Sequence, residues 1–169
     1  MNRLKTLALS LLLITGMGAM APQASAASAS ANFQVTITIT NACDAASLTV
    51  GDVNFGSHSF LDSNITASSN LSVKCTNGAP YQIALSAGAN PSTPGDTTSR
   101  RMTDGTNFVP YNLYSDAAYS ASWGNSSTTG QVSQTGTGAV QTFPIYGKAT
   151  PGNVPAGNYV DTVQATVTY

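Results

Sequence analysis

The sequence predicts an all-β fold, an antiparallel sandwich of short strands, and three observations lead to that prediction. Serine, threonine, asparagine, glycine and alanine dominate the chain, a composition that suits strands and turns and disfavours long helices. Apolar and polar residues alternate in several short runs, while helical periodicity is never sustained. Turn residues separate these runs at intervals of roughly ten residues, as they do in sandwiches.

The first 26 residues have the order of a secretory signal peptide. Two basic residues precede an uncharged apolar run over residues 6–21, and small residues follow up to Ala26. A membrane anchor is the alternative, but this run is short for a span of about 20 residues and contains two glycines. We therefore expect export, with cleavage after Ala26 or, in a second register, after Ala29.

The composition of the remaining chain limits its function. Removing 26 of the 169 residues leaves 143, enough for one domain with one core. Charged residues make up 8% of the chain, against about 25% in an average soluble domain. There are seven aspartates and no glutamate, and four basic residues follow the leader. A basic nucleic-acid surface and a charged amphipathic membrane helix are therefore excluded.

The first strand expected after the leader lies in ANFQVTITIT, residues 31–40. Its apolar side chains alternate with polar ones, the pattern of a half-buried strand; they are Phe33, Val35, Ile37 and Ile39. Burying these four side chains would contribute about 6–12 kcal/mol before ordering costs. Left in water, such a segment is an open edge prone to aggregation, so it needs a groove.

That groove belongs either to the chain's own sandwich or to another chain. The spacer over residues 41–47 is long enough to turn, so pairing within the chain stays open. Strand addition between chains is the second option and is an established mode of recognition.

Cys43 and Cys75 are the only cysteines of the chain. An isolated pair in a small exported domain favours a disulfide. A metal site would need more thiols or imidazoles, and His58 is the only histidine. We expect no metal and no cofactor.

Six further strands are expected along the chain, over residues 47–56, 64–75, 80–86, 107–115, 140–149 and 157–169. Residues 86–99 and 122–138 are predicted to be loops. The last strand shows the clearest alternation, with Asp161 as the exception on its apolar face; that face carries Tyr159, Val163, Ala165, Val167 and Tyr169.

Two isolated residues suggest other functions, a hydrolase site and a sugar-binding site. His58 lies between Ser57 and Ser59, so a serine hydrolase site is one hypothesis, but no nucleophile elbow accompanies it and we expect no enzyme. Trp123 in ASWGN would serve as a sugar-stacking platform if it were exposed, although a lone tryptophan beside glycine more often packs over a sandwich edge.

Several motifs of the mature chain resemble those of the spore coat U domain family, and within it the subunits of archaic chaperone–usher pili. They include the amphipathic strand leading into Cys43, then GDVNFGS (51–57), LSVKC (71–75), YQIALSAG (81–88), RRMTDG (100–105), VPYNLYSDAAYSASWG (109–124), FPIYGKATP (143–151) and AGNYVDTVQATVTY (156–169). The combination of these motifs is specific, whereas each by itself is weak.

The resemblance implies an incomplete immunoglobulin-like β-sandwich that a donor strand completes. Residues 27–42 would then form the donor segment and residues 43–169 the sandwich domain. The donor side chains would be Phe33, Val35, Ile37 and Ile39. The strand beside the acceptor cleft would carry Val163, Ala165, Val167 and Tyr169. Cys43–Cys75 would tie the root of the donor segment to the strand over 64–75.

The resemblance also implies partners and a location. A periplasmic chaperone would fill the cleft first, and at an outer-membrane usher the next subunit's donor strand would replace it, giving a surface fibre. A rod or adaptor subunit supporting adhesion and biofilm formation is favoured over a tip adhesin, because the chain has one domain and keeps a donor strand. A non-polymerising coat or matrix protein and a secreted enzyme stay open as alternatives.

Overall fold

The computed structural model describes residues 25–169, so the predicted leader lies outside this part apart from its last two residues. Residues 25–37 and Thr38–Tyr169 form separate units and are described separately. In the first unit no described residue belongs to a strand, although the alternation predicts one. A strand needs a hydrogen-bonded neighbour, which alternation alone does not supply. Among residues 25–169 no helix is long and apolar enough to cross a membrane.

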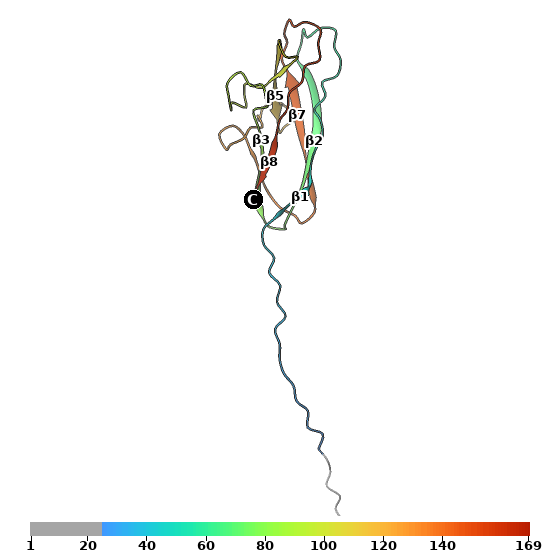
Figure 1. Ribbon diagram of the computed structural model, residues 1–169, viewed down its shortest axis with the longest axis vertical. Helices are drawn as coiled ribbons and strands as arrows, with labels where there is room; N and C mark the ends of the chain where they lie inside the picture. The colour runs from blue at the N-terminus through green and yellow to red at the C-terminus, as the bar shows by residue number, and fades with distance from the viewer. Residues whose placement is uncertain (1–24) are drawn as a thin grey trace, which may run out of the picture. The chain divides into compact units, whose positions relative to one another are not determined.

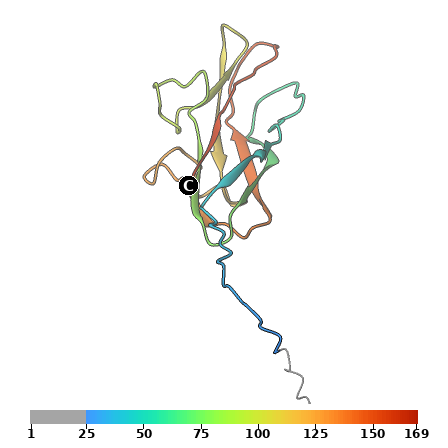
Figure 2. The ribbon, with the colours of Figure 1, turned by 60° about the horizontal axis from the view of Figure 1, so that its bottom comes forward.

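The second unit is a sandwich of two antiparallel sheets. Its strands are β1 (Cys43–Val50), β2 (Ile65–Cys75), β3 (Pro80–Leu85), β4 (Arg101–Thr103), β5 (Phe108–Tyr114), β6 (Val132–Thr135), β7 (Val140–Ala149) and β8 (Ala165–Thr168). One sheet has the order β1-β2-β7-β5-β4 and the other β6-β3-β8. Figure 1 and Figure 2 show the two layers, with β8 beside β3 and β2 beside β7. The all-β sandwich prediction is confirmed.

The strand boundaries differ from the prediction where pairing is irregular. β1 begins at Cys43 and ends at Val50, whereas the predicted strand covers residues 47–56, and the register of β1 against β2 shifts between Asp44 and Thr49. The expected continuation over residues 51–56 lies outside any strand. Two strands were not predicted, β4 with three residues and β6 with four, since such short strands carry almost no alternation to detect.

The core lies between the sheets and is formed by alternate residues of the strands. The ladder from β2 to β7 is the longest, running from Ile65 opposite Ala149 to Lys74 opposite Val140. The buried apolar side chains that make up the core are Leu71, Val73, Cys75, Tyr81, Ile83, Leu85, Val109, Tyr111, Leu113, Trp123, Ile145 and Ala149. All of these residues except Trp123 lie in predicted strands.

Trp123 and Arg100 are also buried, each 1% exposed. The indole N–H of Trp123 donates to the Ile83 carbonyl at 3.0 Å. This burial removes the sugar-stacking alternative for Trp123, because the indole faces are covered by the core. The Arg100 guanidinium donates to the carbonyls of Leu85, Ser86 and Trp123 at 3.0, 2.8 and 3.0 Å.

The predicted disulfide between Cys43 and Cys75 is present. The two residues are direct partners in the β1–β2 ladder. Next to them, the Thr76 hydroxyl accepts a hydrogen bond from the Ala42 amide at 3.2 Å, and the Thr76 amide donates to the Ala42 carbonyl at 2.9 Å. Covalent and hydrogen bonds therefore fix the point where the chain enters β1.

Candidate functional site

An open cleft of about 950 Å³ runs into the sandwich. One wall is the segment over residues 50–61 and the other is the segment over residues 154–165. Core side chains of both sheets form its floor: Leu85, Met102, Val109, Tyr111, Leu113, Ile145 and Ala149. A cleft floored by the core itself indicates a sandwich that lacks one covering strand.

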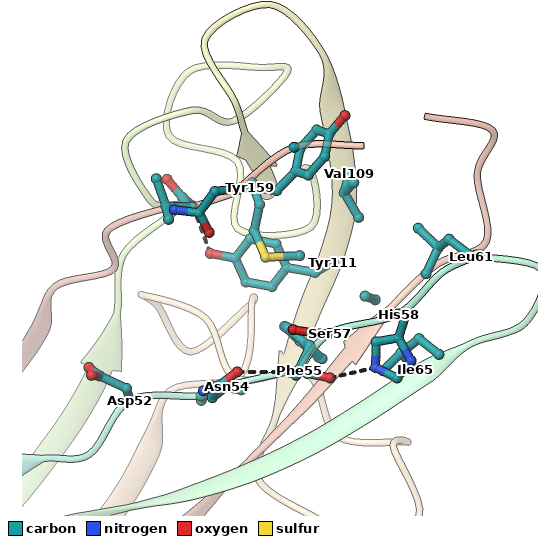
Figure 3. Close-up of a pocket in the computed structure, with 18 of the residues that line it drawn as sticks. Asp52, Asn54, Phe55, Ser57, His58, Leu61, Ile65, Val109, Tyr111 and Tyr159 are labelled. Atoms are coloured by element: carbon teal, nitrogen blue, oxygen red, sulfur yellow. Dashed lines mark hydrogen bonds between the residues drawn. The ribbon is translucent and has the colours of Figure 1, made fainter. Parts of the chain in front are cut away.

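The first wall is held against β7 by aromatic and aliphatic packing. The Phe55 ring lies edge-on to the Tyr111 ring, with centroids 6.4 Å apart. At Gly147 of β7, an added Cβ would lie 2.6 Å from Val53 and 2.9 Å from Phe55, so only glycine leaves room for this wall. In Figure 3 Tyr111 lies between Phe55 on one wall and Tyr159 on the other.

The second wall is paired on one edge only. Val160 exchanges two backbone hydrogen bonds of 2.9 Å with Thr103, and the Ser86 amide donates to the Gln164 carbonyl at 2.9 Å. From Ala165 onward the chain pairs with β3 as strand β8. Within the described residues no strand pairs with the other edge of β8.

The direction of these bonds shows which backbone groups are free. Alternate residues of an antiparallel strand direct their N–H and C=O groups to opposite edges. Because Gln164 faces Ser86, Ala165 and Val167 of β8 direct theirs to the open edge. The cleft therefore offers a row of unpaired hydrogen-bonding groups beside apolar side chains, which is what an added strand requires.

A hydrogen bond joins the floor of the cleft to its second wall. The Tyr111 hydroxyl donates to Asp161 Oδ2 at 2.7 Å. Burial, followed by this hydrogen bond, raises the pKa of Tyr111, so the phenol stays protonated at physiological pH. Burial lowers the pKa of the nearby Arg100 guanidinium. Polar side chains of the first wall, among them Asp52, Asn54 and His58, also line the cleft, whereas its floor is apolar and suits the apolar side chains of an extended chain.

Only two of the four predicted acceptor residues line the cleft. Val163 and Ala165 line the cleft. Val167 lies on the same strand opposite Ile83 and is half-buried against the core, outside the cleft lining. Tyr169 is 61% exposed.

The predicted donor side chains are all exposed to solvent. The exposed fractions are 86% for Phe33, 85% for Val35, 85% for Ile37 and 71% for Ile39. No other run of the described residues places four large apolar side chains in alternation with none of them covered. An uncovered stripe of this kind usually marks an interaction surface.

Sequence reasoning did not identify most of the first wall. Val53, Phe55 and Leu61 line the cleft. The predicted strand over residues 47–56 includes Val53 and Phe55, but these residues lie outside any strand, and nothing in the sequence indicated that they form a wall of the cleft. Tyr111 lies in the predicted strand over residues 107–115, but nothing in the sequence indicated that its hydroxyl meets Asp161. The one signal was Asp161 itself, a carboxylate on an otherwise apolar face.

His58 lies at the cleft but has no catalytic neighbours among the interactions of the described residues. Its Nε2 is 2.7 Å from the Phe55 carbonyl oxygen, as Figure 3 shows, and the side chain is exposed. Residues 25–169 contain no group of three histidine, cysteine, aspartate or glutamate side chains placed to hold a metal ion.

Three comparisons relate this geometry to known proteins. The family model described as Spore Coat Protein U domain matches residues 29–166. Protein U of Myxococcus xanthus is 36% identical over 131 residues, covering 70% of this chain and 72% of that protein.

Among solved structures, a chain in the crystal structure of the CsuC–CsuE chaperone–tip adhesion subunit pre-assembly complex, from archaic chaperone–usher Csu pili of Acinetobacter baumannii, matches with a TM-score of 0.57 and 24% identity. The match covers 78% of this chain and 40% of the solved chain, so this chain spans well under half of that chain's length. The likeness supports the immunoglobulin-like form of the sandwich that the family resemblance implies.

Proposed function

The chain belongs to the Spore Coat Protein U domain family, and from this premise we propose that it is a structural subunit of a chaperone–usher surface pilus. In this proposal the segment over residues 31–40 of one copy fills the cleft of the next copy, and repetition of this donor-strand exchange builds the fibre. A rod or adaptor position follows from the presence of both a donor segment and a cleft in one chain.

The observation that carries the proposal is the complementarity of two features of the same chain. The cleft has an unpaired strand edge beside Val163 and Ala165. The segment over residues 31–40 carries four exposed apolar side chains at every second position. Burying the four side chains would contribute about 6–12 kcal/mol before ordering costs, and backbone hydrogen bonds along the open edge would add to this.

The proposal includes two assembly partners and a location. A subunit with an open cleft exposes its core and a strand edge, which invites aggregation. A periplasmic chaperone that lends a strand, and an outer-membrane usher where the next subunit replaces that strand, would solve this problem. The solved relative was captured as a chaperone–tip adhesion subunit complex, which supports a chaperone partner here. The fibre would lie at the cell surface, where it would support adhesion and biofilm formation.

The alternative is a secreted coat or matrix protein that does not polymerise. The description of the matching family and the similarity to Protein U of Myxococcus xanthus favour this alternative. In that case the segment over residues 31–40 would pair within its own chain.

The test places a charge on one face of the donor segment. Ile37→Asp puts a carboxylate on the apolar face, where burial without a partner costs several kcal/mol, and we expect it to abolish fibres seen by electron microscopy of the cell surface. Thr38→Asp, on the polar face of the same segment, is the matched control and should leave fibres intact. Fibres of normal length from Ile37→Asp would contradict the donor assignment.

A further inference from the structure

Asp161 is a carboxylate on the apolar row of the last segment, between Tyr159 and Val163. Both of its oxygens are engaged within the domain. Oδ2 accepts the Tyr111 hydroxyl at 2.7 Å. Oδ1 accepts the Ala89 amide at 2.9 Å and the Asn90 side-chain amide at 3.1 Å. The side chain therefore connects the second wall of the cleft to the cleft floor and to the loop that follows β3.

The neighbouring loop is shaped around this carboxylate. Gly88 has a φ of +82°, and a Cβ added there would overlap the Asp161 carboxylate. The same stretch of chain is fixed from the other side by Arg100, which donates to the Leu85 and Ser86 carbonyls at 3.0 and 2.8 Å. A hydrogen-bonded carboxylate fitted this closely is costly to remove, because the buried Tyr111 hydroxyl would be left without its acceptor.

The wall that Asp161 holds must stay ordered while one of its edges is unpaired. Its backbone is paired with Thr103 and Ser86 on one edge, and the other edge is open. A strand end that is paired on one side only is expected to open locally, yet an incoming strand needs that edge already formed. Side-chain hydrogen bonds on the core side can supply order without occupying the open edge.

We propose that Asp161, Tyr111, Ala89 and Asn90 form a latch that keeps the acceptor edge of the empty cleft in place until a strand is added. This inference rests on the proposed function and deepens it, since it assigns Asp161 and Tyr111 as positioning residues for strand uptake. The latch matters while the cleft is empty, because in a filled cleft the added strand itself holds the edge.

Hydrogen exchange of the monomeric full chain, followed by mass spectrometry, tests the latch directly. Asp161→Ala and Tyr111→Phe should speed exchange of the amides in residues 159–169 by about tenfold, the effect of losing hydrogen bonds to a charged group, and leave exchange in β2 unchanged. Asp161→Asn should restore part of the protection, because its amide oxygen still accepts from Ala89.

Asp116→Ala is the matched control. The Asp116 carboxylate also accepts several hydrogen bonds, from Ser120 and Ala121, in a loop that does not line the cleft. It should leave exchange in residues 159–169 unchanged. Unchanged exchange there in both Asp161→Ala and Tyr111→Phe would overturn the latch, and so would a uniform increase across the whole domain.

The rate of assembly separates a latch from a merely structural role. Asp161→Ala and Tyr111→Phe should form multimers about tenfold more slowly, while multimers once formed should resist heat in detergent as well as wild-type multimers do. Equal assembly rates, or multimers that melt earlier, would contradict the latch. Wild-type chains that form no multimers would instead contradict the proposed function, whatever the exchange rates of the variants.

Discussion

At the scale of single residues, the buried Arg100 explains how the end of β3 is held. Backbone carbonyls accept its hydrogen bonds, at Leu85, Ser86 and Trp123, so it satisfies acceptors that two loops would otherwise leave buried. Its neighbour Arg101 is half-buried, donates to Asn90 and Pro91, and lies over the Phe108 ring. Two adjacent arginines therefore have different roles, which their sequence context does not distinguish.

Replacing each arginine by methionine tests this difference. We expect Arg100→Met to lower the free energy of unfolding by about 2–4 kcal/mol, because three buried carbonyls lose their donor. Arg101→Met should cost less than about 1 kcal/mol, since its contacts are partly solvated. Chemical denaturation of the two variants measures both values. Equal losses of unfolding free energy in the two variants would contradict a special structural role for the buried Arg100.

At the scale of elements, the disulfide joins β1 to β2 at the root of the proposed donor segment. It closes a loop of 33 residues counting both cysteines, worth about 3–4 kcal/mol by chain entropy. Cys43→Ser should therefore lower the unfolding free energy and the secreted yield, while the cleft lined by Val163 and Ala165 keeps its form. Unaltered melting and secretion would count against this role, and reduction of the wild-type chain is the control.

Aspartate carboxylates accept hydrogen bonds in several turns, so the folding stability is predicted to decrease at acidic pH. The Asp104 carboxylate accepts the backbone amides of Thr106 and Asn107 at 2.9 and 2.7 Å. The hydrogen bonds from Asn107 come first among the causes that lower the pKa of Asp104 from 3.8 to about 2. Hydrogen bonds also lower the pKa of Asp96 and Asp116.

Because the folded pKa of Asp104 lies below the unfolded one, its stabilising effect is complete above pH 4 and is lost as the pH falls toward 2. Asp104→Asn should remove this part of the pH dependence. Thermal unfolding at pH 5 and pH 2 measures the effect. A variant that loses as much thermal stability as the wild type between these two values would rule out the turn as its source.

The strands with clear alternation could be predicted from the sequence, and the segments without a regular partner could not. β2, β3, β5 and β7 lie where alternation places them because each is paired on both edges. The last segment alternates over residues 157–169 but is a strand only in Ala165–Thr168, since only these residues form a regular ladder with β3. The first wall of the cleft was predicted in part as a strand over residues 47–56, but β1 ends at Val50, and the position of Phe55 beside the cleft is known only from the structure.

At the scale of the whole molecule, the chain combines a sandwich that has an open edge with an apolar segment, residues 31–40, that belongs to no strand. Either feature alone would be a liability, because unpaired edges and exposed apolar stripes promote aggregation. Together they allow one copy to complete another, and the low charge of the chain lets copies pack closely without repulsion.

Removal of the donor segment tests the account most directly. Protein sheared from cells is heated in detergent at graded temperatures beside a variant lacking residues 27–40. We predict a ladder of detergent-resistant multimers for the full chain, which collapses on boiling and is absent from the variant. A single monomer band for both, with the variant merely less stable, would show that the segment pairs within its own chain and would contradict the fibre subunit.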